Sequence, residues 1–179
     1  MEENKKKKRR AYLDDFRQTG QGEYEYKGIH YTWKGTKEEL KNSMTKIWIY
    51  AVLMAVCVIG AGCLPVPSMI NCVYVILPFT VCFICGISVI WGLCRLTAGG
   101  TSLRAYVYDA TVEQIPLRAI GTIIGAGGTV AGQLLYLIKY GFQGNLISAF
   151  LFPAALIGAI LSLIFLRNQM KEMNWVRGI

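Results

Sequence analysis

The sequence predicts an all-α integral membrane protein with four transmembrane helices, arranged as two antiparallel hairpins behind a small cytosolic N-terminal region. Residues 47–94 form a stretch of 48 residues without Asp, Glu, Lys, Arg or His. Hydrophobic residues make up 54% of the chain and charged residues 17%, whereas soluble domains are about a quarter charged. The basic residues also cluster on one side of the apolar segments. These observations exclude disordered, collagen-like and soluble globular chains.

The hydrophilic N-terminal region, residues 1–46, holds 12 of the 19 basic and 8 of the 11 acidic residues. It opens with a basic run: Lys5, Lys6, Lys7, Lys8, Arg9 and Arg10. A polybasic segment beside a membrane span is attracted to anionic lipid by about 1 kcal/mol per basic residue. We therefore expect the lipid bilayer and its anionic headgroups as partners and no nucleic acid. The alternative is a solvating tail that only fixes the orientation of the chain.

Aromatic residues alternate in the second half of this region. Tyr24 and Tyr26 precede Gly28, and Tyr31 and Trp33 follow it, which predicts a short β-hairpin with Gly28 in the turn. A lone two-stranded hairpin is marginally stable, so it must pack on the bundle, on a second copy or on another protein. We therefore take these four aromatic residues as a candidate interaction surface.

A helix is predicted to begin just after this hairpin. Thr36 and Glu39 have the spacing of a capping box, in which each side chain binds the backbone N–H of the other residue. This helix is expected to continue into the first apolar span.

The first transmembrane hairpin is predicted over residues 47–94, with spans at 47–64 and 71–94. Each span approaches the 20 or so residues that cross a hydrocarbon core of about 30 Å. Pro65 and Pro67 separate the spans and break any continuous helix.

Residues 95–118 form the predicted cytosolic connector between the two hairpins. Apolar residues at i, i+3, i+4 and i+7 predict an amphipathic helix over residues 101–114. It is expected either to lie on the inner leaflet or to pack on the bundle as an ordinary connector.

The second transmembrane hairpin is predicted over residues 119–166, with spans at 119–138 and 146–166. A cytosolic tail, residues 167–179, follows it. Of the 19 basic residues, 18 fall in the N-terminal region, the connector and the tail, and Lys139 alone lies in an opposite loop. Basic residues mark cytoplasmic loops, so we expect a multi-pass protein of the cell (plasma) membrane with both termini cytoplasmic.

Small residues form stripes on the last two spans. Lipid gives helices little hydrophobic reason to associate, so small residues allow the close backbone approach that holds them together. We therefore expect the third and fourth spans to pack as a tight pair, although a dimer seam is an alternative. The helix-packing residues are Gly121, Gly125, Gly128 and Gly132 on the third span, and Ala154, Gly158 and Ser162 on the fourth.

Cysteines are the main candidates for chemistry. Cys82 and Cys85 form a CxxC motif, but the motif lies deep in a span, where a thiol in apolar surroundings is unreactive. Cys63 and Cys72 flank the proline-rich turn and could form a disulfide. His30 is the only histidine, and no metal-ligand spacing surrounds it. The sequence predicts no catalytic residue, metal or cofactor.

The four spans contain no ionisable residue, although such residues usually mark ion and substrate pathways. Gln133 is the polar group that costs most to bury, and we expect it to bind a neighbouring helix. Our leading hypothesis is a non-catalytic subunit or accessory of a larger membrane assembly, which binds other membrane-protein subunits through its cytosolic surface. The alternatives are a small homo-oligomeric transporter or channel and a membrane thiol-disulfide oxidoreductase.

Overall fold

The computed structural model describes residues 16–18, 24–26, 28–142 and 145–178. The strands are β1 (Phe16–Gln18), β2 (Tyr24–Tyr26), β3 (His30–Trp33), β4 (Ser102–Arg104) and β5 (Trp175–Arg177). The helices are α2 (Lys37–Cys63), α3 (Pro67–Asn71), α4 (Val73–Ala98), α5 (Ala105–Tyr108), the π-helix η2 (Asp109–Glu113), α6 (Gln114–Tyr140) and α7 (Leu146–Lys171).

Within the described residues, four helical segments are long and apolar enough to cross a membrane: Lys37–Cys63, Val73–Ala98, Ala105–Tyr140 and Leu146–Lys171. The first begins at the predicted capping box, since Glu39 N–H donates to Thr36 Oγ1 (3.2 Å) and Thr36 N–H donates to Glu39 Oε2 (3.1 Å). The four-span, all-α membrane fold that the sequence predicts is therefore confirmed.

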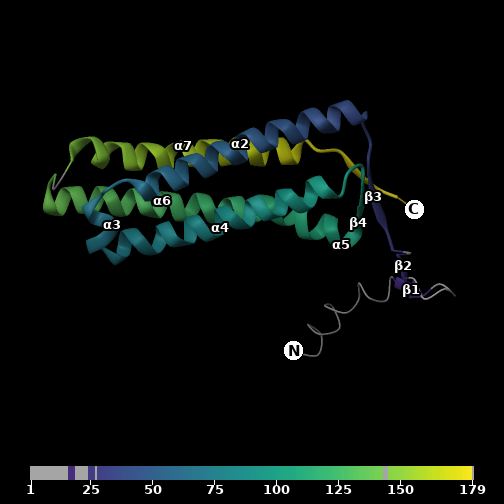
Figure 1. The fold of residues 1–179 in the computed structure, drawn as a ribbon, viewed down its shortest axis with the longest axis horizontal. Helices are drawn as coiled ribbons and strands as arrows, with labels where there is room; N and C mark the ends of the chain where they lie inside the picture. Colours follow the sequence, from purple (N-terminus) through teal and green to yellow (C-terminus); the bar gives the residue numbers. More distant parts are fainter. Residues whose placement is uncertain (1–15, 19–23, 27, 143–144, 179) are drawn as a thin grey trace.

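The long helices are arranged as two closely packed pairs. The most extensive contacts join α4 to α6 and α2 to α7, and α6 also packs on α7, whereas α2 and α4 touch much less. Figure 1 shows the bundle with the β3–β5 end on one side and the α3 turn and the α6–α7 loop on the other. We call these the sheet end and the loop end.

The glycine stripe of α6 faces α4, so the partner predicted for it is wrong. A Cβ atom at Gly125 would lie 2.6 Å from the backbone nitrogen of Cys82, and one at Gly132 would lie 2.8 Å from the carbonyl oxygen of Tyr74. Gly121 and Gly128 likewise meet Cys85 and Pro78 of α4. Because these glycines have no side chains, the two backbones can approach more closely than any other residue would permit.

The small residues of α7 also do not form the contact with α6 that the sequence predicts. A Cβ atom at Gly158 would lie 3.2 Å from the Sγ atom of Cys57 on α2, whereas Ala154 is exposed. Ser162 is buried and donates a hydrogen bond to the carbonyl of Ala159 in its own helix (2.8 Å). Both stripes therefore include residues that pack helices together, but they join the second span to the third and the first to the fourth.

The connector forms a different structure from the predicted helix over residues 101–114. Helix α4 continues to Ala98, Gly99 and Gly100 turn the chain, and β4 occupies residues 102–104. Helix begins again at Ala105 and continues through η2 into α6. The connector thus extends the third span beyond its apolar part, and it packs on the bundle instead of forming a separate surface helix.

Substitutions at two glycines of α6 should separate packing from helix propensity. We expect Gly125→Ala to destabilise the protein by about 2 kcal/mol, the cost typical of overpacking, because the added methyl group would meet the α4 backbone. Gly127→Ala is the control, since nothing lies within 4 Å of a Cβ atom there. Thermal unfolding in mild detergent measures both, and equal stability of the two variants would contradict the α4–α6 packing.

Candidate functional site

The most elaborate local structure is a three-stranded sheet at the sheet end (Figure 1). Its order is β4-β3-β5, and both pairings are antiparallel. Tyr31 stands opposite Leu103 on one side and Arg177 on the other. The sheet therefore unites the three segments that the sequence assigns to the cytosol: the N-terminal region, the connector and the tail.

The hairpin predicted around Gly28 is not formed. Strand β2 pairs instead with β1, with Phe16 opposite Tyr26. Strand β3 pairs with β4 and β5 and not with β2. Pairing with two strands that rest on the bundle gives β3 a buried face, which a local two-stranded hairpin would lack.

The inner face of the sheet is aromatic. The rings of Tyr31 and Tyr108 stack with centroids 3.8 Å apart, and the rings of Trp33 and Trp175 meet edge to face at 5.6 Å. These side chains pack against the core of the bundle, and Leu103 beside them is fully buried. Gly99 makes room for Leu103, since a Cβ atom at that glycine would clash with the leucine side chain.

This packing corrects one part of the predicted interaction surface. Tyr31 and Trp33 are half-buried and point toward the bundle, so their rings fix the sheet in place and are not a free binding face. Tyr24 and Tyr26 lie in β2, and their side chains fall outside the described part of the chain. The basic run from Lys5 to Arg10 also lies outside the described residues.

The outer face of the sheet is polar and open. Thr32, Ser102, Arg104 and Val176 are exposed and alternate with the inward aromatic residues, as expected for a sheet with one solvated face. Trp175, Val176 and Arg177 come from the C-terminal tail, a source that the sequence analysis missed because three residues are too short for a period-2 pattern.

The sheet stands well away from the apolar part of the bundle. Residues 37–46 form the hydrophilic first part of α2, which at 1.5 Å per residue extends for about 15 Å from the start of the helix to the start of the charge-free run. The C-terminal half of the connector continues α6 by a comparable length on the same side. The outer face of the sheet therefore lies at one end of the bundle, beyond the charge-free part of α2.

None of the six cysteines, all of which the structure describes, takes part in a disulfide. Cys63 is exposed at the end of α2, and Cys72 is buried at the start of α4, so the predicted bridge between them is not formed. Cys82 is buried and Cys85 is half-buried, both against the glycines of α6. The CxxC residues are therefore parts of the α4–α6 contact, and among the described residues no three His, Cys, Asp or Glu side chains gather as metal ligands.

Gln133 lies near the loop end and is completely buried. Its Oε1 atom accepts a hydrogen bond from Ser68 of α3, a short helix that the sequence analysis did not anticipate. Its amide nitrogen has no partner among the residues that the structure describes. The expected hydrogen bond to a neighbouring helix is present, and it fixes α3 over the end of the bundle.

Comparison with family models, curated proteins and solved structures finds no match to this chain.

The sheet pairing can be tested with two proline variants in β5. The backbone carbonyl of Asn174 accepts a hydrogen bond from Lys34 N–H (3.1 Å), and the carbonyl of His30 accepts one from Gly178 N–H (2.7 Å). Every second residue of an antiparallel strand bonds to the same neighbour, so Val176 N–H points at β3 and Arg177 N–H points away from it. We expect Val176→Pro to accelerate amide exchange in residues 29–34 about tenfold, because it removes a ladder hydrogen bond.

Arg177→Pro is the matched control, since proline is tolerated where the N–H points away from the ladder. It should leave exchange in residues 29–34 near that of the unmodified protein. Equal acceleration in both variants, or none in either, would contradict the observed register.

Proposed function

We propose that the protein is a non-catalytic subunit or accessory of a larger membrane assembly and that it binds its partner through the outer face of the β4-β3-β5 sheet. The observation that supports this proposal is the convergence of three distant segments into one sheet, about 15 Å of polar helix beyond the charge-free run. A polar face supported by a rigid aromatic layer presents a preorganised surface, which lowers the ordering cost of binding.

The proposed placement has the sheet end in the cytosol and the bundle in the plasma membrane. The basic residues support this orientation, since Lys139 is the only one near the loop end among those that the structure describes. The short loops there offer a partner little surface, whereas the sheet end carries both polar chain and aromatic support.

A non-catalytic role is supported by how the intramembrane polar groups are used. Thr129 donates to the carbonyl of Gly125 (2.8 Å), and Thr122 donates to that of Arg118 (3.1 Å), so these hydroxyls satisfy their own helix. Cys82 and Cys85 contribute to the helix contact. Such internal satisfaction is what a packed span needs in lipid, where an unpaired polar group is costly.

The proposal predicts that acidic substitutions on the outer face release the partner. We expect Thr32→Glu combined with Ser102→Glu to reduce the amount of co-purifying membrane protein about tenfold, equivalent to about 1.4 kcal/mol of binding free energy. These positions are exposed and directly opposite each other, so the two like charges change the face without entering the core. Purification of the full chain from its native membrane in mild detergent, followed by quantitative mass spectrometry, measures the loss.

Lys139→Glu is the control, because it adds acidic charge at the loop end. It should retain the same partners as the unmodified protein. Recovery of unchanged partners with the sheet variant, or equal loss with both variants, would contradict docking through the sheet.

A further inference from the structure

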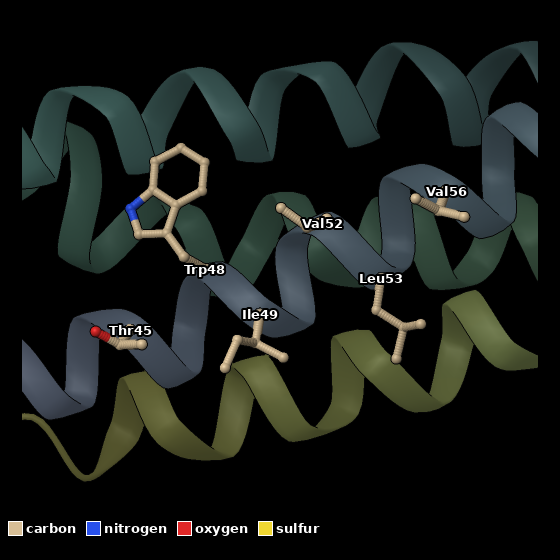
Figure 2. Close-up of a pocket in the computed structure, with 6 residues that line it drawn as sticks. All are labelled: Thr45, Trp48, Ile49, Val52, Leu53 and Val56. Atoms are coloured by element: carbon tan, nitrogen blue, oxygen red, sulfur yellow. The ribbon is translucent and has the colours of Figure 1, made fainter.

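A shallow, open groove lies along the exposed face of α2, separate from the sheet. It has a volume of about 480 Å³ and is lined by Thr45, Trp48, Ile49, Val52, Leu53 and Val56. Figure 2 shows these six side chains along one face of α2, with Thr45 and Val56 at opposite ends. Ile49, Val52 and Val56 are 60%, 54% and 63% exposed, so the bundle itself leaves this face uncovered.

The length and depth of the groove match one leaflet of a bilayer. Thr45 lies at the polar boundary, two residues before the charge-free run begins. From Thr45 to Val56 the helix rises about 17 Å at 1.5 Å per residue. Half of a hydrocarbon core of about 30 Å is about 15 Å, so the groove runs from the headgroup level to the middle of the membrane.

The mouth of the groove is polar and basic. Lys41 lies one helical turn before Thr45 on the same face, and Lys46 flanks it. Neither ammonium group forms an ion pair with a residue that the structure describes. Glu38 precedes Lys41 by three residues, about 4.5 Å along the helix, and precedes Thr45 by about 10 Å.

Two further contacts lie near the polar end of the groove. Trp48 Nε1 donates a hydrogen bond to Thr97 Oγ1 of α4 (3.0 Å), which holds the indole at the polar boundary where tryptophan is favoured. Tyr50 stacks on Phe165 of α7 with centroids 5.6 Å apart.

We propose that this groove binds one anionic glycerophospholipid, with its phosphate-bearing headgroup beside Lys41, Thr45 and Lys46 and an acyl chain along Val52 and Val56. An anionic headgroup matches the unpaired lysines, and the chain matches a groove that ends at the bilayer centre. A parallel second copy of α2 would cover the apolar part but would bring its own Lys41 and Lys46 to the mouth, where like charges repel. The proposal depends on the membrane placement of α2 and not on the proposed assembly partner.

Native mass spectrometry of the full chain, released from detergent micelles with added lipid, tests the site. The probes are phosphatidylglycerol and phosphatidylcholine with identical acyl chains, offered in equal amounts. We expect the unmodified protein to retain one phosphatidylglycerol preferentially. Lys41→Gln combined with Lys46→Gln should reduce this preference about thirtyfold, which is about fivefold for each charge.

Lys34→Gln combined with Lys37→Gln is the control for net charge, since Lys37 precedes Lys41 by about 6 Å and Thr45 by about 12 Å along α2, and Lys34 lies before the helix begins. It should keep the preference. Val52→Trp, which fills the groove, should abolish retention of either lipid. Val81→Trp, at an exposed site on α4, should not.

Equal retention of the two lipids by the unmodified protein would overturn the proposal. Equal loss in the two lysine variants would also overturn it, because it would show diffuse attraction to charge. A lipid-free dimer that Val52→Trp converts to monomer would assign the groove to a second copy of the chain. Because neither lipid probe involves a protein partner, failure here is distinguishable from failure of the sheet-docking proposal.

Discussion

The close approach of α6 to α4 is the constraint on which the rest of the structure depends. In lipid, two apolar helices gain little by leaving the hydrocarbon, so their association relies on van der Waals contact between closely spaced backbones. At Gly125 and Gly132 there is no room for a single additional carbon atom. Pro78 lies in the same contact, and because proline has no N–H, it cannot bond the Tyr74 carbonyl that approaches Gly132. The site that weakens α4 is therefore packed against the glycines of α6.

The sheet performs a complementary role at one end of the bundle. Along the chain, strand β3 precedes α2, β4 comes between α4 and α6, and β5 follows α7. Its two ladders therefore tie the α2–α7 pair to the α4–α6 pair, which would otherwise meet mainly through α6 and α7. The Trp48–Thr97 hydrogen bond adds a second link between the pairs near the polar boundary. The sheet that links the two helix pairs also has the polar outer face on which the proposed function rests.

Much of this architecture could be predicted because the signals are local. The absence of charge over residues 47–94 defines a span pair, and Thr36 with Glu39 marks a helix start through contacts three residues apart. The partners of the helices are a non-local property. Gly125 and Gly132 show that a close contact exists, but the sequence does not say which helix supplies the other backbone, and the small residues of the helix that follows directly favoured α7. The strand that contains Trp175 and Val176 was missed for the same reason, because a strand of three residues can be recognised only from its pairing with β3.

One cross-linking measurement tests the α4–α6 contact most directly. A Cβ atom at Gly121 would lie 3.8 Å from the Cβ atom of Cys85, the separation typical of a disulfide. Mild oxidation of the Gly121→Cys variant in native membranes, followed by peptide mass spectrometry, should reveal an intramolecular bridge from Cys85 to position 121. Gly127→Cys, which faces open space, should remain a free thiol. A free thiol at position 121 under conditions that oxidise accessible cysteines would contradict the account, because α6 would then present its glycines to another helix.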